Sequence, residues 1–229
     1  MIAIGVTGTD TGVGKTVVSC AIAASFAQHG GRVGVMKPIE TGVTTTDGDR
    51  DGLRLAKAAL SQDDMKVVTP YTFPHPVAPL VAARRAKTEI DLGRLDGAFR
   101  AASKNRDVVI VEGAGGLLVP ITPTEAFDSL FVRWKLGVVI VAANRLGVLN
   151  HAQLTTRAAL ASGLRIRAVV LNDVGDAAGD ASVSSNEVML RELLGTVRIL
   201  RFPWVPPPCD HEALAVAAER SGLIEALTA

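Results

Sequence analysis

A phosphate-binding loop is indicated by the run GTDTGVGKT at residues 8–16, which follows an apolar stretch and precedes an Ala-rich segment. Its glycines allow consecutive backbone N–H groups to converge on phosphate oxygens, and the helix expected from Lys15 onward adds the positive end of its dipole. Lys15 can reach the terminal phosphates of a nucleotide, and the Thr16 hydroxyl can bind Mg²⁺. Because a plain turn between a strand and a helix has no packing need for this Lys-Thr pair, the sequence predicts nucleotide binding.

Three small polar residues, Thr9, Asp10 and Thr11, occupy the interior of this loop. A ParA- or MinD-like ATPase is expected to carry an extra lysine early in the loop, and this chain has none there. The three side chains can hold a substrate beside the γ-phosphate. Alternatively, Asp10 and Thr11 only brace the loop through side-chain to backbone hydrogen bonds. The residue types leave both interpretations open.

Candidate metal ligands follow two other segments. Glu112 ends an apolar run and precedes Gly-Ala-Gly-Gly, where a nucleotide-using fold places an acidic metal ligand. Since Mg²⁺ prefers oxygen ligands and keeps only one or two carboxylates beside phosphates and water, Glu112, Thr16 and one aspartate suffice. The aspartate is Asp47, Asp49 or Asp51, and Asp51 is favoured because it directly precedes a helical pattern. The competing interpretations are a salt bridge or a contact with a helix N-terminus for Glu112, and a helix N-cap for Asp51.

Lys37 is a second candidate catalytic cation beside Lys15. It follows a strand-like run and precedes Pro38, which keeps the backbone out of a helix at this point. A cation so placed can neutralise charge that develops on a transferring phosphoryl group. The alternative is a lysine whose tip extends from the sheet edge into water.

Short apolar runs alternate with longer helical patterns, which predicts one α/β domain over residues 1–229 with a mostly parallel sheet of about seven strands, covered by helices on both faces. Ligands of such sheets bind outside the carboxyl ends of the strands, where the residues discussed above are expected to meet. The strands are expected at 2–6, 32–36, 108–111, 137–142, 166–171 and 197–201, and the helices at 15–29, 51–59, 92–104, 125–134, 151–162, 184–194 and 212–226.

Composition excludes several classes of function. The chain has 229 residues, of which 48% are hydrophobic, and a formal net charge of +1 without a basic stripe, so we expect no nucleic-acid partner. Two cysteines, Cys20 and Cys209, support neither a disulfide framework nor a thiolate metal site. We expect a cytoplasmic protein without a leader, and no membrane partner, since no apolar run approaches the roughly 20 residues that span a bilayer.

Six motifs together resemble the ATP-dependent dethiobiotin synthetases, a family with the P-loop NTPase fold. They are GTDTGVGKT (8–16), KPIETG (37–42), PYTFPHPVAP (70–79), VVIVEGAGGLLVP (108–120), LGVLNHAQLT (146–155) and FPWV (202–205). The resemblance implies an enzyme of biotin biosynthesis that uses Mg²⁺ and ATP to close a cyclic urea from 7,8-diaminopelargonic acid and CO₂. It also implies a homodimer in which each substrate site is completed by the partner's 147–151 loop.

The resemblance further implies roles for individual residues. Lys15 and Lys37 would stabilise the phosphoryl group and carbamate, Asn172 would read the adenine, and Thr16, Asp51 and Glu112 would bind the metal. The nucleotide would contact Thr11, Gly12, Val13, Gly14, Lys15, Thr16, Val17, Glu112, Asn172 and Pro203, and the substrate would contact Thr11, Lys37, Thr41, Gly115, Leu149 and Asn150.

Two other functions fit the sequence less well. A ring- or amide-forming ligase of the cobyrinate-amidating type uses a related nucleotide fold, but this sequence shows no glutamine-hydrolysing domain with a catalytic cysteine. A nucleotide-switched binding protein of the ParA or MinD kind would need the early loop lysine, and a membrane-cycling member would carry a basic amphipathic C-terminal helix. Neither feature is present in the sequence.

Overall fold

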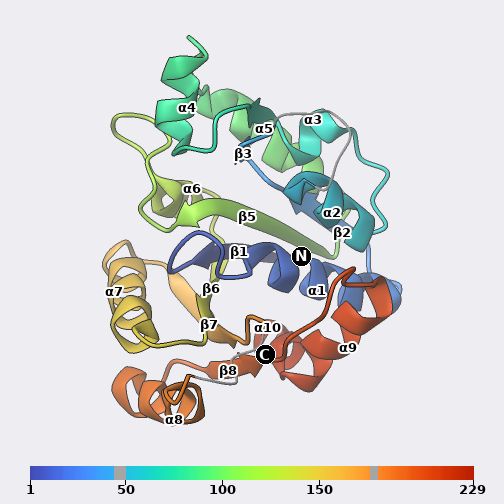
Figure 1. Cartoon of the computed structure of the whole chain (residues 1–229). Helices are drawn as coiled ribbons and strands as arrows, with labels where there is room; N and C mark the ends of the chain where they lie inside the picture. Colours follow the sequence, from blue (N-terminus) through green and yellow to red (C-terminus); the bar gives the residue numbers. More distant parts are fainter. Residues whose placement is uncertain (44–49, 176–179) are drawn as a thin grey trace.

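Six parallel strands form the central sheet of the computed structural model, which describes residues 1–43, 50–175 and 180–229 (Figure 1). Their order is β2-β5-β1-β6-β7-β8, and each neighbouring pair is parallel. All six predicted strands are confirmed: each begins within two residues of its predicted start, and some extend further at the C-terminal end. The sheet has six strands, whereas about seven were expected. The strands are β1 (Ile2–Gly8), β2 (Val33–Met36), β5 (Val108–Gly116), β6 (Gly137–Ala143), β7 (Arg165–Asn172) and β8 (Ile199–Phe202).

The strands are apolar on both faces because each face lies against its own helical layer. In β5, Val108 and Ile110 belong to one hydrophobic core, whereas Val109 and Val111 belong to the other, as the two-residue period of a strand requires. The first core includes residues of α1, α2, α9 and α10, and the second includes residues of α4 to α8. The helices are α1 (Lys15–Gln28), α2 (Asp51–Ala58), α3 (Met65–Val68), α4 (Pro79–Arg85), α5 (Leu92–Ser103), α6 (Phe127–Arg133), α7 (Val148–Ala161), α8 (Val183–Leu194), α9 (His211–Arg220) and α10 (Leu223–Thr228).

The structure corrects the predicted elements in three places. A second, two-stranded parallel sheet pairs β3 (Ile39–Thr41) with β4 (Tyr71–Phe73), and three residues are too few to show a strand period in the sequence. Helices α3 and α4 are likewise short and were not predicted. The single helix expected over 212–226 is two helices, because Gly222 adopts a φ of 73° between α9 and α10.

The sheet order brings the chemically interesting segments together. Since β5 lies between β2 and β1, the chain that follows β2, the end of β5 and the loop after β1 all meet at one edge (Figure 1). The KPIETG motif and the start of PYTFPHPVAP are far apart in sequence, and the pairing of β3 with β4 brings them side by side. Within the described residues, no helix combines the length and apolar character needed to cross a membrane.

Candidate active site

The loop between β1 and α1 has the backbone of a phosphate-binding loop. Gly12 and Gly14 adopt φ values of 74° and 94°, which an L side chain rarely tolerates. Lys15 begins the 14-residue helix α1, and its Nζ donates a hydrogen bond of 2.9 Å to the Asp10 carbonyl oxygen. The Asp10 carboxylate accepts a 2.7 Å hydrogen bond from the Thr11 backbone N–H, so Asp10 does brace the loop. The loop is therefore preformed around the start of a helix, as anion binding requires.

Asn172 supports this loop from the end of β7. Its side-chain nitrogen donates a 3.0 Å hydrogen bond to the Val13 carbonyl oxygen, and the residue is buried. A Cβ atom added to Gly14 would lie 1.9 Å from the same nitrogen, so Gly14 is needed both for its backbone angle and for this close approach.

We expect Gly14→Ala to lower the free energy of unfolding by about 2 kcal/mol or more, because backbone strain and the clash with Asn172 act together. Gly12→Ala is the matched control, since Gly12 also has a positive φ but no atom within 4 Å of its Cβ position. Its cost should be limited to the strain of roughly 1–2 kcal/mol. Urea denaturation of both variants measures the difference, and equal losses would contradict the role given to the Asn172 contact.

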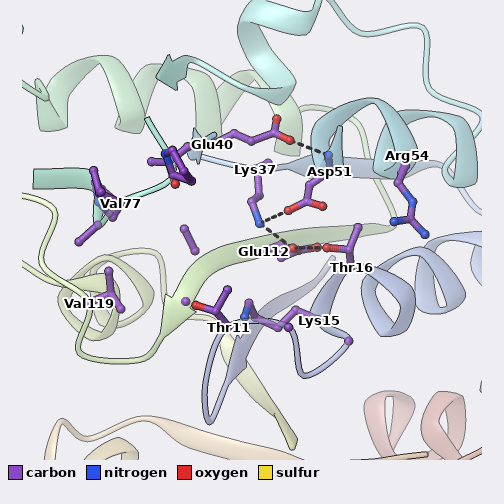
Figure 2. Close-up of a pocket in the computed structure, with 18 of the residues that line it drawn as sticks. Thr11, Lys15, Thr16, Lys37, Glu40, Asp51, Arg54, Val77, Glu112 and Val119 are labelled. Atoms are coloured by element: carbon purple, nitrogen blue, oxygen red, sulfur yellow. Dashed lines mark hydrogen bonds and ion pairs between the residues drawn. The ribbon is translucent and has the colours of Figure 1, made fainter. Parts of the chain in front are cut away.

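A buried charged cluster lies beside the loop (Figure 2). Lys37 Nζ lies 2.6 Å from Glu112 Oε1 and 2.8 Å from Asp51 Oδ2, and the Thr16 hydroxyl donates a 2.8 Å hydrogen bond to the same Glu112 oxygen. Lys37 is 3% exposed and Glu112 is fully buried, so the interpretation of Lys37 as a lysine reaching into water is wrong. The salt bridge that competed with metal binding for Glu112 is present. It joins the predicted catalytic lysine to two of the predicted metal ligands.

The surroundings shift the pKa values of these groups in opposite directions. Burial lowers the pKa of Lys15 to about 8, with a further contribution from the positive charge of Lys37. Burial also opposes the charged form of Lys37, but Glu112 and Asp51 outweigh it and hold the pKa of this lysine above its ordinary value. For Asp51, burial opposes the charged form, but the Lys37 charge and the hydrogen bonds from Lys37 and Thr16 outweigh it and lower the pKa. Lys37 is thus held as a cation between carboxylates.

The residues at this edge fit a hard divalent cation. Glu112 Oε2 is buried and has no hydrogen-bond partner among the described residues, and such an atom calls for a ligand. The Thr16 hydroxyl and the Asp51 carboxylate belong to the same hydrogen-bonded cluster. Two carboxylates and a hydroxyl are a donor set that Mg²⁺ accepts beside phosphates and water. The other candidate aspartates, Asp47 and Asp49, lie outside the described residues.

A cavity of about 560 Å³ opens over the loop and the charged cluster. Most residues predicted for nucleotide, metal or substrate lie in its wall, although their roles stay predictions. The predicted residues that line it are Thr11, Gly12, Gly14, Lys15, Thr16, Val17, Lys37, Thr41, Asp51, Glu112 and Gly115.

Five predicted residues do not line this cavity. Val13 belongs to the loop but is buried, and Asn172 donates a hydrogen bond to the Val13 carbonyl oxygen. Pro203 directly follows Phe202, the register partner of Asn172, so both lie at the same sheet edge. Leu149 and Asn150 lie in the first turn of α7. This helix was expected to begin at His151 but begins at Val148, because Gly147 adopts a φ of 92°.

The cavity also contains residues that sequence reasoning did not assign. The segment Pro76–Pro79 belongs to a motif that was identified, but the pairing of β3 with β4 that places it was not predicted. Glu40 lies in the KPIETG motif, and Arg54 follows Asp51 by one helical turn, a spacing that could have pointed to it. Val119 comes from the chain after β5.

Comparisons with known proteins identify the family of this chain. A family model described as an AAA domain matches residues 3–210. The ATP-dependent dethiobiotin synthetase BioD of Thermodesulfovibrio yellowstonii is 37% identical over 232 residues, covering 97% of this chain and 96% of its own. Proteins of the same name from Anaeromyxobacter sp. strain Fw109-5 and Xylella fastidiosa strain 9a5c are 39% and 36% identical, covering 87% and 95% of this chain and 89% and 96% of their own.

One solved structure shows the same fold at low sequence identity. The MinC:MinD cell division protein complex of Aquifex aeolicus has a TM-score of 0.52 and 15% identity, covering 99% of this chain and 93% of that chain. This likeness concerns the fold alone. The BioD relatives decide the family, because they share 36–39% of residues with this chain and match most of its length: the chain belongs to the ATP-dependent dethiobiotin synthetases.

Proposed function

We propose that this protein converts 7,8-diaminopelargonic acid, CO₂ and ATP into dethiobiotin, ADP and phosphate, a step of biotin biosynthesis. The observation that carries the proposal is the single cavity in which a phosphate-binding loop, the buried Lys37 and the carboxylates of Asp51 and Glu112 meet. The relatives named as dethiobiotin synthetases over nearly the whole chain support the same reaction.

The proposed reaction needs no protein nucleophile. One amine of the substrate attacks CO₂, a C–N bond forms, and a proton leaves to give a carbamate. A carbamate oxygen then attacks the γ-phosphorus of ATP, and the bond from that phosphorus to ADP breaks. The second amine attacks the carbonyl carbon of this mixed anhydride, the ring closes, and phosphate and a proton leave. Catalysis then depends on positioning and on stabilising negative charge.

The residues of the cavity match these demands. Lys15 and Lys37 would neutralise charge on the transferring phosphoryl group, and Thr11, Thr41 and Gly115 would contact the carbamate or the diamine. Thr16, Asp51 and Glu112 would hold Mg²⁺, which supplies positive charge to the nucleotide phosphates when bound. Asn172 and Pro203 would border the adenine.

A homodimer with a shared substrate site completes the proposal. Leu149 and Asn150 do not line the cavity of their own chain, although both were predicted to bind substrate. Leu146 is 81% exposed and Leu154 is 57% exposed, on or just before the same helix, and a partner subunit would cover them. We further propose that the chain acts as one domain in the cytoplasm.

We expect phosphate release to require all three substrates, because the carbamate formed from the diamine and CO₂ supplies the nucleophile that attacks ATP. A coupled phosphate assay with diaminopelargonate, bicarbonate and Mg-ATP, omitting one component at a time, tests this. Formation of dethiobiotin is followed in parallel by mass spectrometry. ATP hydrolysis at full rate without the diamine would instead favour a nucleotide switch.

A further inference from the structure

Helix α2 begins without a cap from its own flanking residue. The N-cap residue Arg50 offers no side-chain hydrogen bond, although the first backbone N–H groups of a helix need partners. The partner comes from strand β3: Glu40 Oε1 accepts a 2.6 Å hydrogen bond from the Asp51 N–H, and Glu40 Oε2 accepts a 3.4 Å bond from the Gly52 N–H. The carboxylate also suits the positive end of the helix dipole.

The contact between Glu40 and α2 is close and largely buried. Glu40 is only 5% exposed. A Cβ atom at Gly52 would lie 2.0 Å from Thr69 Oγ1 and 3.4 Å from Glu40 Oε2, so the backbone of the helix packs directly against both side chains. These neighbours leave the first turn of α2 little freedom to move.

Asp51 is held from two sides (Figure 2). Glu40 binds its backbone N–H, and Lys37 Nζ lies 2.8 Å from its side-chain oxygen. A buried glutamate beside another carboxylate is costly, and a neutral serine or asparagine cap would satisfy a helix N-terminus without a second negative charge. The arrangement is explained if the site needs Asp51 fixed in one orientation.

We propose that Glu40 is a positioning residue, which fixes the start of α2 so that the Asp51 carboxylate is aimed at the metal. This inference rests on the proposed function in one respect, that Asp51 binds Mg²⁺. Residues that orient metal ligands typically change metal affinity or activity by about 10–100-fold when they are removed.

Mn²⁺ binding in the presence of the ATP analogue AMP-PNP tests the inference, with free Mn²⁺ measured by electron paramagnetic resonance. We expect Glu40→Ala to weaken Mn²⁺ binding about tenfold. Glu40→Gln should weaken it less, because one amide oxygen can still accept a hydrogen bond from Asp51. Asp51→Asn is the reference for loss of the ligand itself. The matched control is Asp91→Ala, which removes a carboxylate that caps α5 through Gly93 outside the cavity.

A second readout separates positioning from a general loss of stability. In Glu40→Ala, the Mg²⁺ concentration for half-maximal turnover should rise while the KM for the diamine changes little, and hydrogen exchange should increase in the first turn of α2. Asp91→Ala should change none of these. If Glu40→Ala proves unfolded, Glu40→Gln, which keeps the volume and one acceptor, gives the same comparison.

The outcomes distinguish the two proposals. Wild-type Mn²⁺ affinity in both Glu40 variants, with weakened binding in Asp51→Asn, would overturn the role of Glu40 and leave the proposed function intact. Unchanged binding in Asp51→Asn would overturn the metal assignment and, with it, this inference.

Discussion

Replacing Lys37 with alanine should lower turnover at saturating substrates by about a hundredfold to a thousandfold, the usual loss when a group that stabilises transition-state charge is removed. Lys37 is buried and held as a cation between Glu112 and Asp51, at the wall of the cavity. Lys15→Ala should differ, because the loop lysine also reaches the phosphates of the bound nucleotide. That variant should weaken both nucleotide binding and chemistry. Steady-state kinetics and AMP-PNP titration measure the two effects separately.

Lys37→Ala also leaves the carboxylates of Asp51 and Glu112 without their shared cation, and Glu112 is fully buried. Removing one partner of a buried pair commonly costs about 3–5 kcal/mol, so lost activity must be separated from lost stability. Turnover of Lys37→Ala is therefore measured at a temperature at which circular dichroism shows the variant folded. The double variant Lys37→Met/Glu112→Gln, which removes the closer buried pair, should recover much of the stability and is compared for stability alone. Near-parental turnover of Lys37→Ala would show that the assigned role is wrong.

Mixing two inactive variants should restore up to about a quarter of the parental activity if the substrate site is shared between subunits. Lys37→Ala disables the phosphate end of a subunit but leaves its 147–151 segment intact, whereas Asn150→Pro removes the Asn150 side chain and a backbone N–H from that segment. In a random equal mixture, half of the dimers are mixed, and each of these has one unmutated site of two.

The structure makes Asn150→Pro a suitable partner for this experiment. Asn150 is the third residue of α7, where backbone N–H groups have no partner within the helix, so proline there breaks no helical hydrogen bond. The residue is exposed, which limits the packing cost. Mass spectrometry should confirm mixed dimers, and circular dichroism should confirm folding. Mixed dimers without activity would place the whole substrate pocket within one chain.

The central sheet was predictable because its strands are buried on both faces and contrast with the helices between them. The phosphate-binding loop was equally clear, since its glycines, Lys15 and Thr16 are adjacent in sequence. The pairing of β3 with β4 could not be predicted, because a three-residue strand is too short to show an alternating pattern. The paired residues Ile39 and Tyr71 are also 32 positions apart in the sequence. The contact of Glu40 with α2 was missed for the same reason, since only the folded chain brings them together.

The order β2-β5-β1 has an evolutionary consequence. The chain leaves the sheet after β2 and returns only at β5, and this excursion contributes one wall of the cavity, including Thr41, Asp51 and Pro76–Pro79. The opposite wall comes from the loop after β1 and from the end of β5. Sequence changes at Thr41 or Pro76–Pro79 can therefore alter this wall during evolution while the loop after β1, the end of β5 and the buried cluster of Lys37, Asp51 and Glu112 stay unchanged.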